Sequence, residues 1–228
     1  MQFPSPLFIC RLHRRYKRFL ADMVLPDGTM VTAHCPNPGA MTGLADPGMP
    51  CWIAAARPGG KLAWGWKLAQ TATGLALIDT TMANRVVAEG LAARTLPGLP
   101  AYDTIRPETP LADSRIDFRL DGRGGPTWLE VKSVTLSRNG WAEFPDSRTA
   151  RGTRHLQALT AAAQAGETAA MVYLLARTDA TRIRIAADID PAYAVAFATA
   201  RAAGVRMIGL ATAITPEGVT ATHPVPVA

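Results

Sequence analysis

The chain has 228 residues, of which 48% are hydrophobic and 18% charged, so it is too apolar to be a disordered chain. No apolar run approaches the roughly 20 residues that a membrane-spanning helix needs, and the first residues lack the order of a secretion signal. The three cysteines form no C-x-x-C pair, which argues against a zinc knuckle or a disulfide framework. We therefore expect a cytoplasmic protein. Its net charge of +6 mildly favours a polyanionic partner.

The strongest local concentration of charge follows position 13. It comprises four cations and one aromatic ring, namely Arg14, Arg15, Tyr16, Lys17 and Arg18. If residues 14–19 form a strand, alternation places Arg14, Tyr16 and Arg18 on one face. Cations beside an aromatic ring suit the phosphates and bases of DNA, and we predict DNA binding here. The alternative is a charged edge strand that only prevents aggregation.

Short strands broken by turn residues fill the first part of the chain. The expected strands are 18–25, 29–34, 51–56, 61–70 and 75–80. Proline and glycine at 26–28, 36–39 and 57–60 mark the turns between them. Five short strands in this length predict an OB-fold-like barrel that binds nucleic acid, over residues 1–81.

Beyond residue 81 the pattern changes to mixed helix and strand. The expected helices are 83–94, 150–165 and 191–203, and the expected strands are 104–109, 115–120, 127–134, 168–176 and 206–212. The 168–176 run is apolar throughout, which is typical of a buried parallel strand. This order predicts an α/β domain over residues 82–228.

Two neighbouring strands of this domain carry candidate catalytic residues. The two-residue period of a strand places Asp117 on one face of its strand and its neighbours Ile116 and Phe118 on the other face. It puts Glu130 and Lys132 on one face of the next strand, so that pairing would bring two carboxylates and one ammonium together. Carboxylates bind Mg²⁺ or Mn²⁺, and a lysine beside them can orient or deprotonate a water that attacks a phosphodiester. The alternative is a cross-strand ion pair on a solvated face.

Further charged residues are candidates for the same site. Glu89 in the preceding helix and Glu108 in the preceding strand could each supply an outer metal ligand, or be solvated charges. Arg151, Arg154 and His155 are spaced for one face of a helix, which suits contacts to DNA phosphates. His155 packing against the sheet is the alternative.

Four other residues are interpreted as structural. Cys35, which precedes a proline-rich turn, is expected to be buried, and no third ligand accompanies it to form a metal site. Asn37 and Gly39 have the chemistry of a turn, with a role at the domain junction. Asp146 precedes a helix and is expected to stabilise its N-terminus.

Ordered blocks along the whole chain resemble one known family. The blocks are Phe3-Pro4-x-Pro6-Leu7, residues 14–22, His34-Cys35-Pro36-Asn37-x-Gly39-x-Met41, residues 114–118, residues 130–136, Phe144-Pro145-Asp146 and Thr149-x-Arg151-Gly152-x-x-His155-Leu156. They resemble the sugar fermentation stimulation protein A family of bacteria and archaea. The resemblance implies an N-terminal OB-fold, a C-terminal domain similar to PD-(D/E)XK nucleases, non-specific DNA binding and a regulatory role in maltose metabolism. It maps the nuclease motif onto Asp117, Glu130 and Lys132.

Three functions are compatible with these patterns. The first is a DNA-binding nuclease that uses Mg²⁺ or Mn²⁺, and the second is a non-enzymatic DNA-binding regulator of sugar catabolism that retains a vestigial site. The third is a carbohydrate-binding barrel, since Trp52, Trp64 and Trp66 fall in the first domain. We expect no membrane partner. The sequence leaves open single-stranded or double-stranded DNA, and a monomer or a homo-oligomer.

Overall fold

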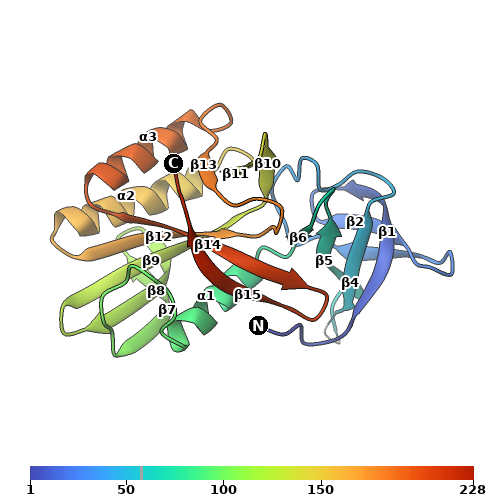
Figure 1. Ribbon diagram of the computed structural model, residues 1–228, viewed down its shortest axis with the longest axis horizontal. Helices are drawn as coiled ribbons and strands as arrows, with labels where there is room; N and C mark the ends of the chain where they lie inside the picture. Colours follow the sequence, from blue (N-terminus) through green and yellow to red (C-terminus); the bar gives the residue numbers. More distant parts are fainter. Residues whose placement is uncertain (57–58) are drawn as a thin grey trace.

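The computed structural model describes residues 1–56 and 59–228, and its first part is a small barrel (Figure 1). The barrel strands are β1 (Leu7–Tyr16), β2 (Leu20–Val24), β3 (Met30–His34), β4 (Pro50–Ala55), β5 (Trp64–Gln70) and β6 (Leu75–Leu77). They hydrogen-bond in the order β3-β2-β1-β4-β5-β6, and a parallel pairing of β3 with β5 closes the barrel. The predicted OB-type barrel is therefore confirmed.

The basic segment that follows position 13 is not one continuous strand. β1 ends at Tyr16, and Lys17 and Arg18 adopt positive φ angles of 48° and 62°, which turn the chain into β2. Because this left-handed conformation interrupts the alternation of a strand, Arg14, Tyr16 and Arg18 do not share one strand face. A continuous strand over residues 14–19 is therefore not formed, and the strand predicted at 18–25 begins later, at Leu20.

The second part is an α/β domain. Its helices are α1 (Met82–Ala92), α2 (Ala150–Gln164) and α3 (Pro191–Ala202). The strands of its main sheet are β7 (Thr104–Leu111), β8 (Ser114–Gly122), β9 (Gly125–Val134), β12 (Thr168–Leu175), β14 (Arg206–Thr215) and β15 (Gly218–Val225). They lie in the order β15-β14-β12-β9-β8-β7, and β12 pairs in parallel with both β9 and β14. Residues 168–175 are thus the buried parallel strand that the apolar run predicted.

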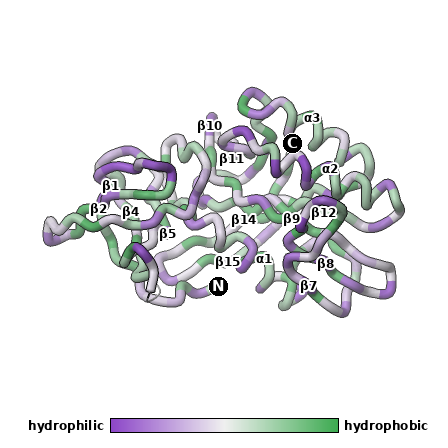
Figure 2. Tube along the Cα trace, turned by 180° about the vertical axis from the view of Figure 1, so that it is seen from behind, coloured by the Kyte–Doolittle hydropathy of each residue, from purple (hydrophilic) through white to green (hydrophobic). Residues whose placement is uncertain are grey.

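Helices cover both faces of this sheet. One hydrophobic core includes Val86, Val87 and Leu91 of α1, and another includes Leu156 of α2 and Phe197 of α3. Figure 2 shows hydrophobic stretches mainly in the interior and hydrophilic stretches at the outer turns. The sheet is therefore the middle one of three layers. Polar side chains can reach solvent where the margin of the sheet meets the helices.

Several elements were absent from the expectation. A small second sheet consists of β10 (Leu136–Arg138), β11 (Trp141–Phe144) and β13 (Ile183–Ile185), and β14 is followed by the antiparallel β15. The first residues, which fall in the predicted barrel unit, lie against the second domain: the N–H of Phe3 donates to the carbonyl of Glu217 at 3.0 Å. Part of the predicted turn at 57–60 lies outside the described residues.

Candidate active site

The strands β8 and β9 separate where the candidate carboxylates lie. Their antiparallel pairing extends as far as Phe118, which is opposite Leu129. At Asp117 a side-chain hydrogen bond replaces the one between the two backbones: Oδ2 of Asp117 accepts a hydrogen bond from the N–H of Val131 at 2.8 Å. The N–H of Asp117 in turn donates to Oε2 of Glu130 at 3.2 Å. The split in the sheet therefore holds the two carboxyl groups beside each other.

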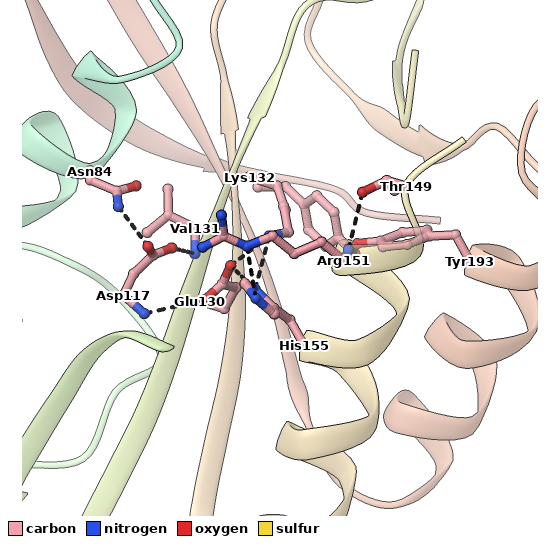
Figure 3. Close-up of polar contacts among 11 residues, drawn as sticks. Asn84, Asp117, Glu130, Val131, Lys132, Thr149, Arg151, His155 and Tyr193 are labelled. Carbon is pink, nitrogen blue, oxygen red and sulfur yellow. Dashed lines mark hydrogen bonds and ion pairs between the residues drawn. The ribbon is translucent and has the colours of Figure 1, made fainter. Parts of the chain in front are cut away.

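The two carboxylates make contacts with helices on opposite sides of the sheet (Figure 3). Oδ1 of Asp117 accepts a hydrogen bond from Nδ2 of Asn84 in α1 at 2.7 Å. Oε1 of Glu130 contacts Nδ1 of His155 in α2, and it lies 2.5 Å from Nζ of Lys132. The structure thus brings Asp117, Glu130 and Lys132 together, but through the gap between two strands and not by simple alternation on one face.

Burial and charge set different pKa values for the two acids. Burial, followed by the nearby charge of Glu130, raises the pKa of Asp117 to about 6. Burial alone would raise the pKa of Glu130 as well, but the hydrogen bond with His155 and the charge of Lys132 outweigh it, so that this pKa lies below its usual value. At neutral pH Glu130 is the firmly ionised member of the pair.

Helix α2 places two more polar groups at the site. The helix begins after Thr149, whose side chain accepts a hydrogen bond from the N–H of Gly152 at 3.1 Å and caps the first turn. One turn apart on the helix, Nε of Arg151 donates to Nε2 of His155 at 3.3 Å. Since Nε2 accepts, Nδ1 of His155 carries the proton that faces Glu130. The cap is Thr149; Asp146, expected to stabilise this N-terminus through the helix dipole, lies three residues earlier, and its carboxylate accepts a hydrogen bond from Met41.

Both domains line one cavity of about 540 Å³ around these residues. The barrel contributes Arg18 and residues 37–39, and the α/β domain contributes the two acids, Lys132 and residues 144–151. Oδ2 of Asp146 accepts a hydrogen bond from the N–H of Met41 at 3.3 Å, which links the two walls. The site is therefore an interdomain site, with carboxylates at its floor and arginines at its rim.

The basic segment of the barrel divides into three roles. Arg18 lines the cavity, and one of its Nη atoms donates to the carbonyl of Pro38 at 2.8 Å. Arg15 holds the cavity loop, since its Nη2 donates to the carbonyls of Asn37 and Gly39, both at 3.0 Å. Arg14 pairs with Asp22 and Tyr16 hydrogen-bonds the same carboxylate, while Lys17 is exposed.

Three other predicted residues lie outside the cavity. Glu89 pairs with the amino group of Met1 at 2.7 Å, and its side chain is 57% exposed. Glu108 and Arg154 are exposed and do not line the cavity. Of the group proposed on α2, only Arg151 and His155 reach the site, and His155 is a buried contact of Glu130.

The sequence offered no indication of several residues at the site. Asn84 is 33 residues from Asp117 along the chain, and nothing in a helical pattern distinguishes it from a solvated asparagine. Arg148 and Thr80 also line the cavity. Cys35 is buried, as predicted, and Asn37 and Gly39 lie at the domain junction. Asn84, Thr80 and Arg148, which the sequence did not indicate, reach the site only through the tertiary fold.

The donor set fits a hard divalent cation. Burial first, and the charge of Glu130 second, raise the pKa of Asp117, and a divalent cation would stabilise both carboxylates in their ionised form. Oxygen donors are the ligands that Mg²⁺, Mn²⁺ and Ca²⁺ prefer. Within residues 1–56 and 59–228 no group of three or more His, Cys, Asp or Glu side chains is placed to hold a metal. In the same part of the chain no helix is long and apolar enough to cross a membrane.

The fold and the site define a two-domain protein in which an OB barrel and an α/β domain share one polar cavity. The description "SfsA N-terminal OB domain" matches residues 14–78, and "Sugar fermentation stimulation protein RE domain" matches residues 81–218. The chain belongs to the sugar fermentation stimulation protein family.

Relatives and a solved structure agree with this assignment. The chain is 51% identical to a sugar fermentation stimulation protein homolog of Jannaschia sp., covering 100% of this chain and 97% of the relative. It is 53% identical to the homolog of Ruegeria pomeroyi, over 96% of this chain and 97% of that relative. "The structure of Pyrococcus Furiosus SfsA in complex with Ca2+" matches with a TM-score of 0.92 at 25% identity, over 100% of this chain and 98% of the other.

Proposed function

We propose that this protein binds DNA without sequence preference and hydrolyses its phosphodiester bonds with the help of Mg²⁺ or Mn²⁺. The observation that carries the proposal is the meeting of Asp117, Glu130 and Lys132 in a cavity rimmed by arginines from both domains. Acids would hold the cation, and arginines would hold the phosphates on either side of it. The solved relative in complex with Ca²⁺ supports a divalent cation in this family.

The residues would divide the work as follows. Asp117 and Glu130 would hold the metal, which when bound supplies Lewis acidity and lowers the pKa of a water molecule. Arg18 and Arg151 would bind the nonbridging oxygens of the phosphodiester. Lys132, held 2.5 Å from Glu130, would donate hydrogen bonds and stabilise the negative charge that develops on the phosphoryl group.

The test is cleavage of a panel of labelled substrates, comprising single-stranded, duplex, flapped and branched DNA together with RNA, in Mg²⁺ or Mn²⁺. Wild type should give products, and Lys132→Ala should lower the rate by about 100-fold or more. Binding is measured in Ca²⁺ in parallel, and Arg201→Ala, an exposed cation of α3, serves as the control variant. Cleavage that is equal in wild type and Lys132→Ala would contradict the proposal.

One observation favours the second candidate, a non-enzymatic DNA-binding regulator of sugar catabolism. Oε1 of Glu130 is already in contact with both Lys132 and His155, so the acid is neutralised without a metal. Such a site would link β8, β9 and α2 within the α/β domain as a scaffold. DNA binding without cleavage of any substrate in the panel would favour this function.

A further inference from the structure

A second hollow lies beside the candidate active site, between the barrel and the start of α1. It has a volume of about 470 Å³. Its lining includes one aromatic ring, one imidazole and three cations, namely Trp64, His34, Lys61, Lys67 and Arg85. We call this hollow the barrel groove. The carboxylates of the active site do not line it, so it is a separate surface.

The segment that joins the barrel to α1 separates the groove from the active-site cavity. Thr80 and Asn84 line the cavity, whereas their neighbours Thr81 and Arg85 line the groove. Adjacent residues of one segment therefore face the two spaces, and this segment lies between them. A chain leaving the cavity across it would enter the groove directly.

A second connection runs over the surface of the barrel. Arg18 lines the cavity, and its guanidinium carbon lies 5.9 Å from the centre of the Phe19 ring. The Phe19 ring stacks on His34, with ring centres 6.4 Å apart and planes inclined by 22°. His34 lines the groove. A cation, an aromatic ring and an imidazole thus lead from one space to the other.

The groove combines free positive charge with aromatic surface. Lys67 is neutralised by Asp79 at 2.5 Å, but within the part of the chain that the structure describes Lys61 and Arg85 have no ion pair. Trp64 is the aromatic ring of the groove and is half-buried. It packs edge-on against Phe8, with ring centres 5.3 Å apart; Phe8 lies beside the groove and is 48% exposed. Exposed cations beside a partly exposed aromatic ring are the combination that binds a phosphate backbone and stacks its bases.

We propose that the barrel groove binds a single-stranded segment of nucleic acid that continues from the phosphodiester in the active-site cavity. Base faces are accessible for stacking only in an unpaired strand, which favours a single strand over a duplex. The unpaired cations favour a polyanion over a neutral oligosaccharide. The proposal rests on the proposed function for the position of the reacting phosphate, but the groove can be tested without catalysis.

The test measures binding of a labelled oligothymidylate of about 20 nucleotides, longer than the site of one OB domain, and of a duplex of equal length, in EDTA. Lys61→Glu and Arg85→Glu should each weaken single-strand binding by about tenfold and lower the salt slope. Arg123→Glu makes the same charge change in the exposed turn between β8 and β9 and should have little effect. Trp64→Leu should weaken binding by about fivefold or more, and Trp64→Phe should restore most of it.

The outcomes separate this inference from the proposed function. Loss of single-strand affinity in the groove variants, with a smaller change for the duplex, supports the groove even if no substrate is cleaved. Equal losses for single strand and duplex, or affinities equal to wild type in folded variants, would overturn it. Binding of maltohexaose that displaces the oligothymidylate and is independent of salt would overturn it in favour of a carbohydrate site.

Discussion

Oε1 of Glu130 and Nδ1 of His155 are in contact inside the α/β domain, where both side chains are at most 5% exposed. This contact joins the floor of the active site to helix α2, and Arg151 continues the connection to the cavity rim. Because the imidazole holds one oxygen of the carboxylate, the other oxygen is directed toward Asp117. His155 thus positions Glu130.

Replacement of His155 should therefore weaken metal binding. We expect His155→Ala to lower the affinity for Ca²⁺ by about 10- to 100-fold, as for other residues that orient a metal ligand. His155→Asn, whose amide can replace Nδ1 as a donor, should stay closer to wild type. Calorimetric titration of the metal-free protein with Ca²⁺ measures both. Equal affinities in His155→Ala and wild type would show that Glu130 needs no such support.

The raised pKa of Asp117 predicts that the free energy of unfolding of the metal-free protein decreases as the pH rises. Its pKa of about 6 in the folded state exceeds the ordinary value of 3.8 in the unfolded chain, so the folded state binds more protons and stability falls as pH rises between these values. The shift corresponds to about 3 kcal/mol above pH 6. Asp117→Asn should remove this loss, because an amide can still accept from Val131. Urea unfolding in EDTA from pH 4 to pH 8 measures the difference.

The control for this experiment is Asp113→Asn, an exposed aspartate in the turn between β7 and β8. The free energy of unfolding of Asp113→Asn should change with pH in the same way as that of wild type. Addition of Ca²⁺ at pH 7 should stabilise wild type and leave Asp117→Asn nearly unchanged, because the ion replaces the repulsion between two acids by attraction. An identical pH profile for wild type and Asp117→Asn would contradict the shift.

Local patterns were sufficient to predict the elements that carry the site. The continuous apolar run at 168–176 predicted strand β12, and the alanine-rich composition with its glycine stop predicted helix α2. The two-residue period of a strand predicted that Glu130 and Lys132 share a face. The split between β8 and β9 at Asp117 could not be predicted this way. It depends on side-chain bonds to Asn84 and Val131, which are 33 and 14 residues away.

The parts that escaped prediction involve unusual backbone or distant pairing. Lys17 and Arg18 turn the chain with positive φ although neither is a glycine, so the sequence contained no sign that a strand ended there. β11 and β13 pair in parallel between residues 41 positions apart, such as Ala142 with Ile183, and each is too short for a clear period. Tertiary contacts and not local propensity determine both features.

The turn at Lys17 and Arg18 permits a matched test of the cavity rim. Both residues are exposed and have positive φ, but only Arg18 lines the cavity. Asparagine tolerates this backbone conformation, so Arg18→Asn and Lys17→Asn remove one charge each without added strain. Arg18→Asn should weaken DNA binding and lower the slope of affinity against salt by about 0.7 to 0.9, and Lys17→Asn should do less. Equal effects would indicate general attraction to the basic surface.

Gly39 and Asp146 permit a test of the domain junction. A Cβ placed on Gly39 would lie 2.0 Å from Oδ2 of Asp146, the oxygen that accepts from the N–H of Met41. Gly39→Ala must therefore displace that carboxylate and break the bond between the two cavity walls, at a cost of about 1–3 kcal/mol. Asp146→Ala loses the same bond but removes the clashing oxygens.

The double variant should accordingly be more stable than the sum of the two single changes predicts, since both remove one shared contact. Urea unfolding of all four proteins gives the coupling free energy, which we expect to be about 1 kcal/mol or more. Strict additivity would mean that the loop of the barrel and the segment before α2 do not depend on each other. A measurable coupling would show that residues 37–41 and Asp146 hold the two walls of the cavity at a fixed separation, as an interdomain site requires.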